Sequence, residues 1–206
     1  GAGMTVPMSV GATTVLLPER PTPQSVLQVL HGNQPTIFFG VPTLYAAMLA
    51  DPDCTPENSS AKLRVCVSAG EALPEDVGKT WKQRMGVDIF DGIGSTEMLH
   101  VFLSNKPGDI RYGTSGKAFE GYDLRLVDEE DQEVGTDEIG ELLVSGGSAA
   151  DGYWNQRDKS RATFQGVWTR TGDKYFRDGE GYYHCCGRTD DMFKVSGRWV
   201  SPFEVE

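Results

Sequence analysis

The stretch Asp91-Gly92-Ile93-Gly94-Ser95-Thr96-Glu97 places two glycines, two hydroxyl groups and two carboxylates in one short segment. It follows the apolar run Val87–Phe90, which is typical of a buried strand. The short apolar segment Met98–Leu103 comes next. The pattern therefore predicts a strand that leads into a glycine-rich turn.

Each residue type in this turn suits a phosphorylated ligand. Glycines let the backbone approach a ligand closely, and N–H and hydroxyl groups bind phosphate oxygens. A carboxylate such as Glu97 can hold the magnesium ion that accompanies phosphates. An ordinary strand-to-helix turn explains the same residues, with Ser95 or Thr96 as the helix cap. The seven residues alone leave both interpretations open.

Composition limits the class of protein. The chain has 206 residues, 38% of them hydrophobic, which is enough to bury a core. Thirty acidic and 19 basic residues give a net charge of −11, which argues against a nucleic-acid partner. The sequence shows neither an apolar run of the ~20 residues a membrane helix needs nor a signal-peptide pattern, so we expect no membrane partner and a cytoplasmic location. Because the chain stops in mid-pattern at Phe203–Glu206, we expect the natural protein to extend beyond both ends.

The sequence gives little indication of a catalytic nucleophile or a metal cage. There is no GxSxG motif, and the three histidines have neither metal spacing nor a nucleophile beside them. His100 is typical of a satisfied core histidine, although its position beside the glycine-rich turn leaves a pocket role open. The cysteines form no CxxC pair, so neither a disulfide framework nor a zinc site is indicated; they are Cys54, Cys66, Cys185 and Cys186.

The order of patterns predicts an α/β fold in the first half. After an apolar segment at Met4–Leu17, expected to be a strand or a buried turn, helices and strands alternate. Leu63–Val67 is predicted as a strand and Pro74–Met85 as the helix that returns the chain to the next strand. Ligands bind at the carboxyl ends of such parallel strands, so the turns at Ser68–Ala72 and Asp91–Glu97 should share one rim.

The second half is predicted to be β-rich. From about Lys106, glycines separate short alternating runs such as Tyr122–Val127 and Glu141–Val144, which favour antiparallel strands and a barrel-like subdomain. The Thr169–Asp173 turn offers a carboxylate that could bind ribose hydroxyls, or that merely stabilises the turn. Arg188 with Asp190 and Asp191 could clamp a ligand or form a local salt bridge.

Taken together, these motifs resemble those of the adenylate-forming acyl-CoA synthetase superfamily, and the resemblance covers essentially the whole chain. The motifs that carry this resemblance are Ser68–Pro74, Gly92–Glu97, Gly140–Leu142 through Gly152–Trp154, Thr171–Asp173, and Gly187–Asp190 to Gly197 with Glu204–Glu206. Within the superfamily, three segments look most like those of benzoate-CoA ligases and their aryl-CoA relatives: Ser68–Pro74, Asp91–Asn105 and Lys159–Phe164.

The resemblance implies a fold and a reaction. The fold is part of the large N-terminal domain of such an enzyme: an α/β adenylate- and aryl-binding subdomain at residues 1–105, a β-rich subdomain at 106–186, and the hinge and start of a lid domain at 187–206. An aromatic carboxylate, as in aromatic degradation, attacks ATP with Mg²⁺ to give an acyl-adenylate, and coenzyme A then displaces AMP. The family's phosphate loop and its adenylation lysine have no match here, so we expect this chain alone to be inactive.

The resemblance also assigns nucleotide roles residue by residue. Glu97 matches the magnesium-binding glutamate and Thr96 the hydroxyl that faces the α-phosphate. Asp173 matches the ribose-binding aspartate, with Arg188 near the same ribose. The adenine segment corresponds to Gly70, Glu71 and Ala72, together with Asp91, Gly92 and Ile93. Asp91 and Ile93 depart from the pattern, because many relatives carry asparagine and tyrosine there.

Other roles concern the acid and the lid. Small residues could leave a flat slot for an aromatic ring, although small residues also pack backbones tightly without any such role. Asp190 matches the hinge about which the lid swings, and Lys194 and Gly197 match the loop that reaches the coenzyme A side. The predicted aryl pocket consists of Ala69, Gly92, Gly94 and His100, with Ile93 as a possible wall.

Two alternatives stay open. Another adenylate former, such as a fatty acyl-CoA ligase, would prefer long-chain acids. A non-catalytic nucleotide-binding module would be favoured if the natural gene lacked both the phosphate loop and the adenylation lysine. The sequence leaves the ring substituents of the acid and the oligomeric state open.

Overall fold

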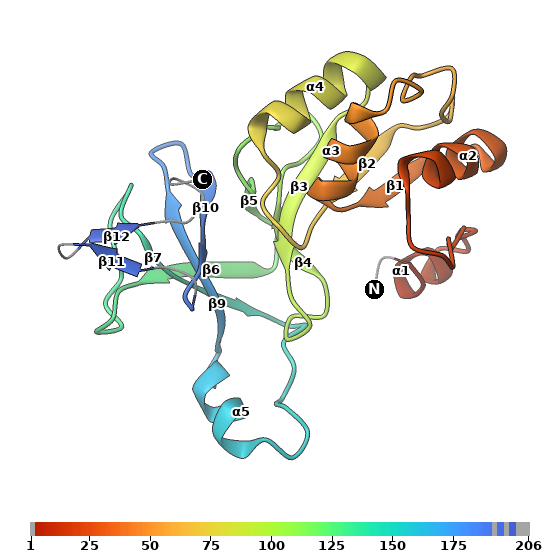
Figure 1. Ribbon diagram of the computed structural model, residues 1–206. Helices are drawn as coiled ribbons and strands as arrows, with labels where there is room; N and C mark the ends of the chain where they lie inside the picture. The colour runs from red at the N-terminus through yellow and green to blue at the C-terminus, as the bar shows by residue number, and fades with distance from the viewer. Residues whose placement is uncertain (1–2, 191–192, 196–197, 201–206) are drawn as a thin grey trace. The chain divides into compact units, whose positions relative to one another are not determined.

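The computed structural model describes residues 3–190, 193–195 and 198–200 (Figure 1). The chain divides into two compact units. The first unit comprises Gly1–Gly92 and Asn105–Gly113, and the second comprises Ile93–Ser104 and Thr114–Glu206.

The first unit is an α/β structure built on parallel strands. Strand β2 pairs with β1 on one side and with β3 on the other, both parallel, and its last residue Ser68 stands opposite Asp91. Helix α3 packs against α2 and α4 (Figure 1). The elements are α1 (Thr5–Ser9), α2 (Pro23–Asn33), β1 (Ile37–Gly40), α3 (Pro42–Ala50), β2 (Val65–Ser68), α4 (Glu75–Met85) and β3 (Ile89–Gly94), whose last two residues belong to the second unit.

Helix α4 shows why the βαβ pattern could be recognised in the sequence. Pro74 precedes the helix, and Glu75 and Asp76 occupy its first turn, where carboxylates favour the helix dipole. Basic residues occupy the last turn, and Gly86 ends the helix in the left-handed conformation at φ 73°. The buried face includes Trp81.

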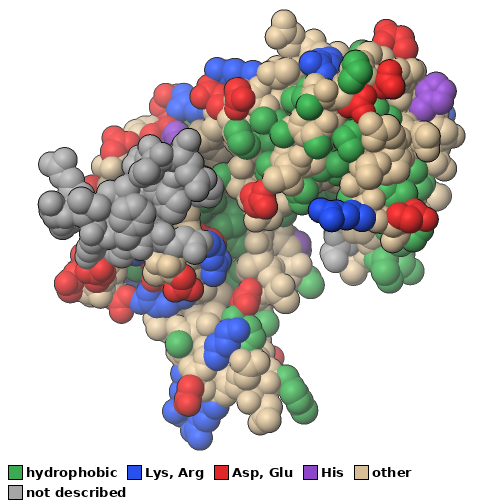
Figure 2. All heavy atoms as spheres, viewed as in Figure 1, with side chains coloured by type: hydrophobic (Ala, Val, Ile, Leu, Met, Phe, Trp, Pro, Cys, Tyr) green, Lys and Arg blue, Asp and Glu red, His purple; other side chains and the backbone are tan. Residues whose placement is uncertain are grey.

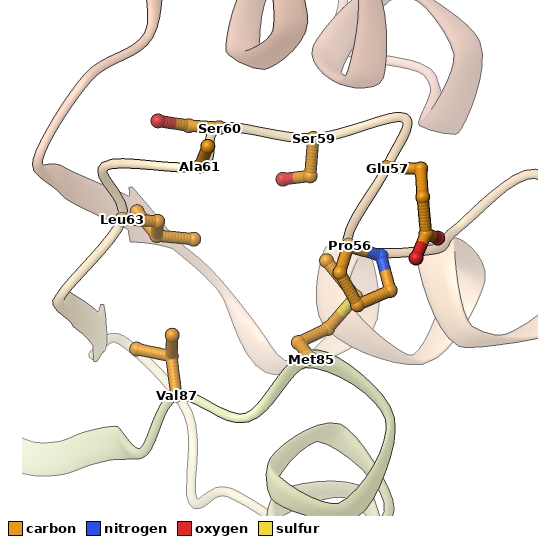
Figure 3. A pocket seen from close by; sticks show the side chains of 8 residues that line it. All are labelled: Pro56, Glu57, Ser59, Ser60, Ala61, Leu63, Met85 and Val87. Carbon is orange, nitrogen blue, oxygen red and sulfur yellow. The ribbon is translucent and has the colours of Figure 1, made fainter.

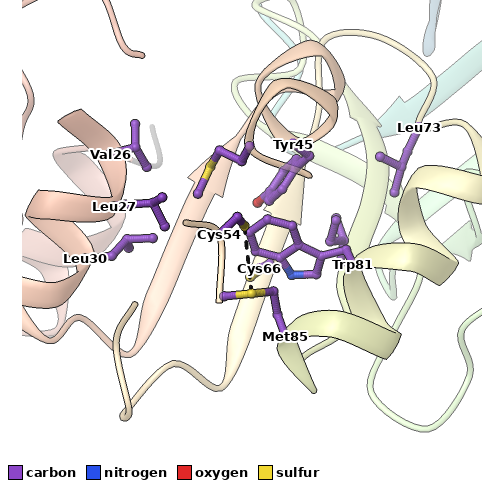
Figure 4. Packing of buried hydrophobic residues seen from close by; sticks show 11 residues of the cluster. Val26, Leu27, Leu30, Tyr45, Cys54, Cys66, Leu73, Trp81 and Met85 are labelled. Atoms are coloured by element: carbon purple, nitrogen blue, oxygen red, sulfur yellow. Dashed lines mark hydrogen bonds between the residues drawn. The ribbon is translucent and has the colours of Figure 1, made fainter. Parts of the chain in front are cut away.

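Trp81 and Tyr45 are at the centre of the core of the first unit (Figure 4). Both side chains are fully buried, and their rings meet edge to face with centroids 4.8 Å apart. The Tyr45 hydroxyl donates a 3.0 Å hydrogen bond to the carbonyl of Val67, so α3 is joined to β2. The thiol of Cys54 lies 3.9 Å from the Met85 sulfur. This core fixes the strands whose ends carry the predicted ligand turns.

The second unit is antiparallel. Strand β4 pairs with β5, and the larger sheet has the order β10-β9-β7-β6, with β8 against β9. Its core contains Phe102 and Leu142. The elements are β4 (Val101–Ser104), β5 (Lys117–Ala118), β6 (Tyr122–Val127), β7 (Gly140–Gly146), α5 (Arg157–Thr163), β8 (Phe164–Gln165), β9 (Trp168–Arg177), β10 (Tyr183–Arg188), β11 (Phe193–Val195) and β12 (Arg198–Val200).

Helix α5 lies beside β8 and β9 (Figure 1). Its sequence, Arg-Asp-Lys-Ser-Arg-Ala-Thr, contains three basic residues and one acidic residue. Figure 2 shows lysine and arginine side chains at the surface around this helix. The helix is thus locally basic in a chain that is acidic as a whole.

The structure confirms the predicted α/β portion followed by a β-rich portion. It contradicts the expectation of a strand or buried turn at Met4–Leu17, because Thr5–Ser9 forms α1 and Met8 is 69% exposed. The glycine-rich turn leads into β4 and not into a helix. Among the described residues, no helix combines the length and the apolar character needed to cross a membrane.

Candidate functional site

The turn between β3 and β4 depends on Gly94. A Cβ atom at this position would lie 2.6 Å from the carbonyl oxygen of His100 and 2.7 Å from the Cα of Val101. These are backbone atoms, so only glycine allows the two arms of the turn to approach so closely. Ser95 closes the turn by accepting a 3.2 Å hydrogen bond from the Met98 N–H.

Glu97 is held in this turn through both its main chain and its side chain. The Ala150 N–H donates a 2.7 Å hydrogen bond to the Glu97 carbonyl. The Tyr153 hydroxyl donates a 2.5 Å hydrogen bond to Glu97 Oε1. This bond lowers the pKa of Glu97 below its usual value, with smaller contributions from Ser95 and Lys159, while partial burial opposes the change. Glu97 is therefore a carboxylate at neutral pH.

The surroundings of Glu97 fit magnesium bound together with a nucleotide. Within the described ranges, no three His, Cys, Asp or Glu side chains gather as a metal cage. Mg²⁺ commonly binds to one or two carboxylates and takes its other ligands from phosphate and water. A single ionised, partly exposed carboxylate beside the exposed Thr96 suits that mode.

His100 belongs to a hydrogen-bonded group in the same unit. Its Nδ1 lies 2.6 Å from the Val101 carbonyl, and its Nε2 lies 3.3 Å from the Tyr122 hydroxyl. That hydroxyl also lies 2.7 Å from Ser148 Oγ, which donates a 2.8 Å hydrogen bond to the Met98 carbonyl. The ring of His100 is exposed, not part of the core, and its nitrogens are oriented by these contacts.

Asp173 and Arg188 form a second group. Arg188 Nη1 donates hydrogen bonds to Asp173 Oδ1 at 2.9 Å and to the Thr171 carbonyl at 3.2 Å. Burial raises the pKa of Asp173, and Arg188 only partly offsets this effect. Gly172, directly before Asp173, has φ 73°. Its carbonyl accepts a 2.8 Å hydrogen bond from the Thr189 N–H. The strand β9 therefore bends where it presents the carboxylate.

The adenine segment predicted from the sequence lies in the first unit. Ala69, Gly70, Glu71 and Ala72 follow directly after β2, with Gly70 at φ 98° and Glu71 exposed. Asp91 on β3 is only 4% exposed. Burial raises the pKa of Asp91 to about 7, while the backbone of Leu73 and Gly92 and the nearby Ser68 hydroxyl act in the opposite direction. The buried carboxyl thus connects the adenine segment with the glycine-rich strand.

The remaining predicted residues are placed as follows. Gly92 is buried on β3, and Ile93 is half-buried on the same strand. Asp190 is exposed in the turn after β10. Lys194 belongs to β11, where it is paired with Trp199 of β12, and Gly197 lies outside the described residues. Among the residues that it describes, the structure therefore brings the predicted nucleotide residues into three local groups, around Glu97, around Asp173 and around Asp91, and it does not bring Asp190 or Lys194 into any of them.

Sequence reasoning missed Tyr153, Ser148 and Tyr122. Tyr153 contacts a carboxylate that is 56 positions earlier in the chain, so no local pattern joins the two. The available signal was the place of Tyr153 inside the Gly152-Tyr153-Trp154 motif, where a polar aromatic residue follows glycine.

Two surface hollows lie in the first unit, away from the predicted residues. One, of about 320 Å³, lies between the loop at residues 56–61 and the residues Met85 and Val87 (Figure 3). The other, of about 360 Å³, includes Asp51 and Arg84 in its wall. None of the predicted site residues lines either hollow, so their geometry does not point to the adenylate chemistry.

Similarity to known proteins extends over the whole chain. A 4-hydroxybenzoate–CoA/benzoate–CoA ligase of Rhodopseudomonas palustris is 63% identical over 206 residues, all of this chain and 38% of that protein. A benzoate–CoA ligase of Thauera aromatica is 61% identical over 207 residues, all of this chain and 39% of that protein. The chain thus spans less than two fifths of the length of these two relatives.

A solved structure has the same fold. The anthranilate CoA ligase AuaEII, in a crystal structure with anthranoyl-AMP, superposes with a TM-score of 0.95 at 52% identity over all of this chain and 40% of that one. The model of a family described as "AMP-binding enzyme" matches residues 1–154, which is most of the chain. The chain therefore belongs to the AMP-binding enzyme family.

Proposed function

We propose that these residues are part of an ATP-dependent aryl-CoA ligase. It would convert benzoate or a substituted benzoate through an acyl-AMP intermediate to its CoA thioester. The observation that carries the proposal is the 61–63% identity, over every part of this chain, to two ligases named for benzoate. The bound anthranoyl-AMP in a relative with TM-score 0.95 supports the acyl-adenylate step.

Glu97 is proposed to hold the magnesium ion of the nucleotide. When bound, Mg²⁺ offsets charge on the phosphate oxygens and orients them. The support in this chain is an ionised carboxylate fixed by Tyr153 and Ala150, on a turn whose close backbone approach requires Gly94. Thr96, exposed next to Glu97, is proposed to donate a hydrogen bond from its hydroxyl to the α-phosphate.

Asp173 and Arg188 are proposed to bind the ribose. A carboxylate accepts hydrogen bonds from ribose hydroxyls, and a neighbouring guanidinium limits the carboxylate to one orientation. The 2.9 Å contact between Nη1 of Arg188 and Oδ1 of Asp173 orients the carboxylate, whose remaining acceptor sites suit ribose hydroxyls. Adenine is proposed to lie along Gly70, Glu71 and Ala72, with Asp91, Gly92 and Ile93 nearby.

The acid and the thiol are assigned to other residues. We propose that the aryl group lies against Ala69, Gly92, Gly94 and His100, and that coenzyme A approaches near Lys194 and Gly197. The proposed arrangement keeps an α/β part at residues 1–105 and a β-rich part at 106–186. Residues 187–206 would contain the hinge, at Asp190, and the start of the lid domain.

The proposal has two further parts. Since more than three fifths of the length of the relatives has no counterpart in these 206 residues, the chain alone is expected to be inactive. A cytoplasmic location agrees with the buried thiols of Cys54 and Cys66.

The alternatives to the proposed function are another acyl-CoA synthetase, with a preference for long-chain acids, and a non-catalytic nucleotide-binding module.

Exchange of pyrophosphate into ATP tests the proposal. The natural protein that carries this sequence would be assayed with benzoate, 4-hydroxybenzoate, anthranilate and a C16 fatty acid. Benzoate-dependent exchange at least tenfold above the fatty acid is expected. A preference for the fatty acid would favour the first alternative, and the lack of exchange with any acid would favour the second.

A further inference from the structure

The connection between β7 and α5, residues 147–156, contacts the turn that carries Glu97 at three points. The Ala150 N–H reaches the Glu97 carbonyl at 2.7 Å. The Ser148 hydroxyl reaches the Met98 carbonyl at 2.8 Å. The Tyr153 hydroxyl reaches the Glu97 carboxylate at 2.5 Å. Two of these contacts fix the main chain, and only the third fixes the carboxylate itself.

Tyr153 is itself held from three sides. Its ring contacts Phe164, with centroids 5.4 Å apart, and Lys159 Nζ lies 4.4 Å from the ring centroid. Its N–H donates a 2.8 Å hydrogen bond to Ser160 Oγ. Lys159 and Ser160 belong to α5, so this helix determines where the tyrosine hydroxyl lies.

The hydrogen bond from Tyr153 to Oε1 limits the orientations of the Glu97 carboxylate. A carboxylate offers about four acceptor sites on two oxygens. The bond from Tyr153 uses one of them and restricts the rotation of the group, so the remaining sites are presented to a cation in a limited range of orientations. A partly exposed glutamate without this bond would have to be ordered when the cation binds.

From these contacts we infer that Tyr153 is a positioning residue, which holds the Glu97 carboxylate in the orientation that binds the metal ion of the nucleotide. This inference rests on the proposed metal-binding role of Glu97. The main-chain contacts of Ala150 and Ser148 already hold the turn, so the hydroxyl of Tyr153 is not needed to form it. Partners that orient a metal ligand typically change metal affinity by about 10–100-fold when removed.

Binding of Mn²⁺, followed by its electron paramagnetic resonance signal, tests this inference without turnover. The natural protein would be titrated with Mn²⁺ in the presence of α,β-methylene-ATP, which cannot form an adenylate. Tyr153→Phe keeps the ring and removes the hydroxyl, and it should raise the Kd of Mn²⁺ about tenfold. Glu97→Gln should raise the Kd of Mn²⁺ further. The double variant, with Tyr153→Phe added to Glu97→Gln, should bind Mn²⁺ no more weakly than Glu97→Gln alone.

Tyr182→Phe is the matched control. The ring of Tyr182 also has a lysine over it, with Lys117 Nζ 4.1 Å from the centroid. This variant should leave Mn²⁺ binding unchanged. If Tyr153→Phe does not fold, as judged by circular dichroism, Phe164→Leu is the second variant. It removes the ring that packs against Tyr153 and changes no charge near Glu97, and it should raise the Kd by a smaller factor because the hydroxyl remains.

Each outcome decides a separate point. An unchanged Kd in Tyr153→Phe, with weaker binding in Glu97→Gln, overturns the role of Tyr153 and leaves that of Glu97 intact. Unchanged binding in both variants overturns the metal role of Glu97 and this inference with it. An equal loss from Tyr153→Phe with and without Glu97 shows that Tyr153 acts through another group and also overturns the inference.

Discussion

Arg188 Nη1 lies 2.9 Å from Asp173 Oδ1, across the ladder that joins β9 to β10. The two members of this pair have different surroundings, because the side chain of Arg188 is 55% exposed and that of Asp173 only 17%. Water screens the cation, while the carboxyl loses most of its hydration. The pair therefore orients Asp173 more than it stabilises the fold.

Replacing Asp173 with asparagine should weaken nucleotide binding without destabilising the protein. Burial raises the pKa of Asp173 above its unfolded value, so the ionised carboxylate costs stability, and this cost appears as the pH rises above the unfolded pKa. At pH 8, Asp173→Asn should melt at the wild-type temperature or slightly above it. The affinity for ATP, measured by calorimetry, should fall at least about tenfold.

Asp123→Asn is the control for this change, because Asp123 is an exposed aspartate on β6 of the same sheet. It should change neither the melting temperature nor the affinity for ATP. A variant of Asp173 that melts several degrees lower but binds ATP normally would assign this carboxylate to the fold instead.

Asp91→Asn should make the protein less sensitive to pH. The folded pKa of Asp91, about 7, lies above the ordinary value, so the buried acid favours folding at low pH and costs stability as the pH rises from about 4 to 7. The full cost is on the order of 4 kcal/mol. Urea unfolding at pH 5 and pH 8 should therefore separate the variant from the wild type mainly at pH 8. An equal difference at the two pH values would contradict this explanation.

Gly94→Ala should lower stability and turnover together. The new Cβ would meet backbone atoms of His100 and Val101 at 2.6–2.7 Å, and backbone cannot move aside as a flexible side chain can. Such overpacking typically costs about 1–3 kcal/mol. Gly147→Ala is the control, since a Cβ there meets nothing within 4 Å. If Gly94→Ala lost benzoate turnover but kept its melting temperature, the glycine would serve the aryl slot alone.

In acid, Asp178→Asn should lose less stability than the wild-type protein does. Burial alone would raise the pKa of Asp178, but hydrogen bonds from His184 and from the backbone of Tyr182 and Glu180 outweigh it and lower the pKa to about 2. A depressed folded pKa stabilises the protein above about pH 4, and this stabilisation is lost as the pH falls toward 2.

Urea unfolding at pH 6 and pH 2.5 checks this expectation. Wild-type protein should lose more free energy of unfolding between the two pH values than Asp178→Asn does. Glu180→Gln, at an exposed position in the same turn, should behave like the wild type. Equal losses in all three proteins would show that the contacts of Asp178 do not contribute.

The sequence predicted those features that depend on local patterns. The alternation of apolar residues and the glycine after Met85 were enough to place α4 and the strands on either side of it. The prediction of a strand or buried turn at residues 4–17 was wrong, because hydrophobic residues are buried only where other elements cover them. Val10, for example, is 76% exposed.

Contacts between distant parts of the chain could not be predicted. The bond from Tyr153 to Glu97 depends on where the β7–α5 connection lies, and the need for glycine at position 94 depends on the approach of His100. The turn that carries Glu97 also contains Ser95 and Thr96, which are residues expected at the start of a helix. It leads instead into β4, which pairs with β5, a strand more than ten residues further along the chain.

Binding of a non-hydrolysable benzoyl-adenylate analogue tests the central claim most directly. Titration calorimetry would compare the natural protein that carries this sequence with its Asp173→Ala variant, and circular-dichroism melts would confirm that both fold. We predict that the wild type binds with a Kd at least about tenfold below that of a variant with the same melting temperature. Equal affinity of the two folded proteins, or no binding by the wild type, would contradict the adenylate site proposed here.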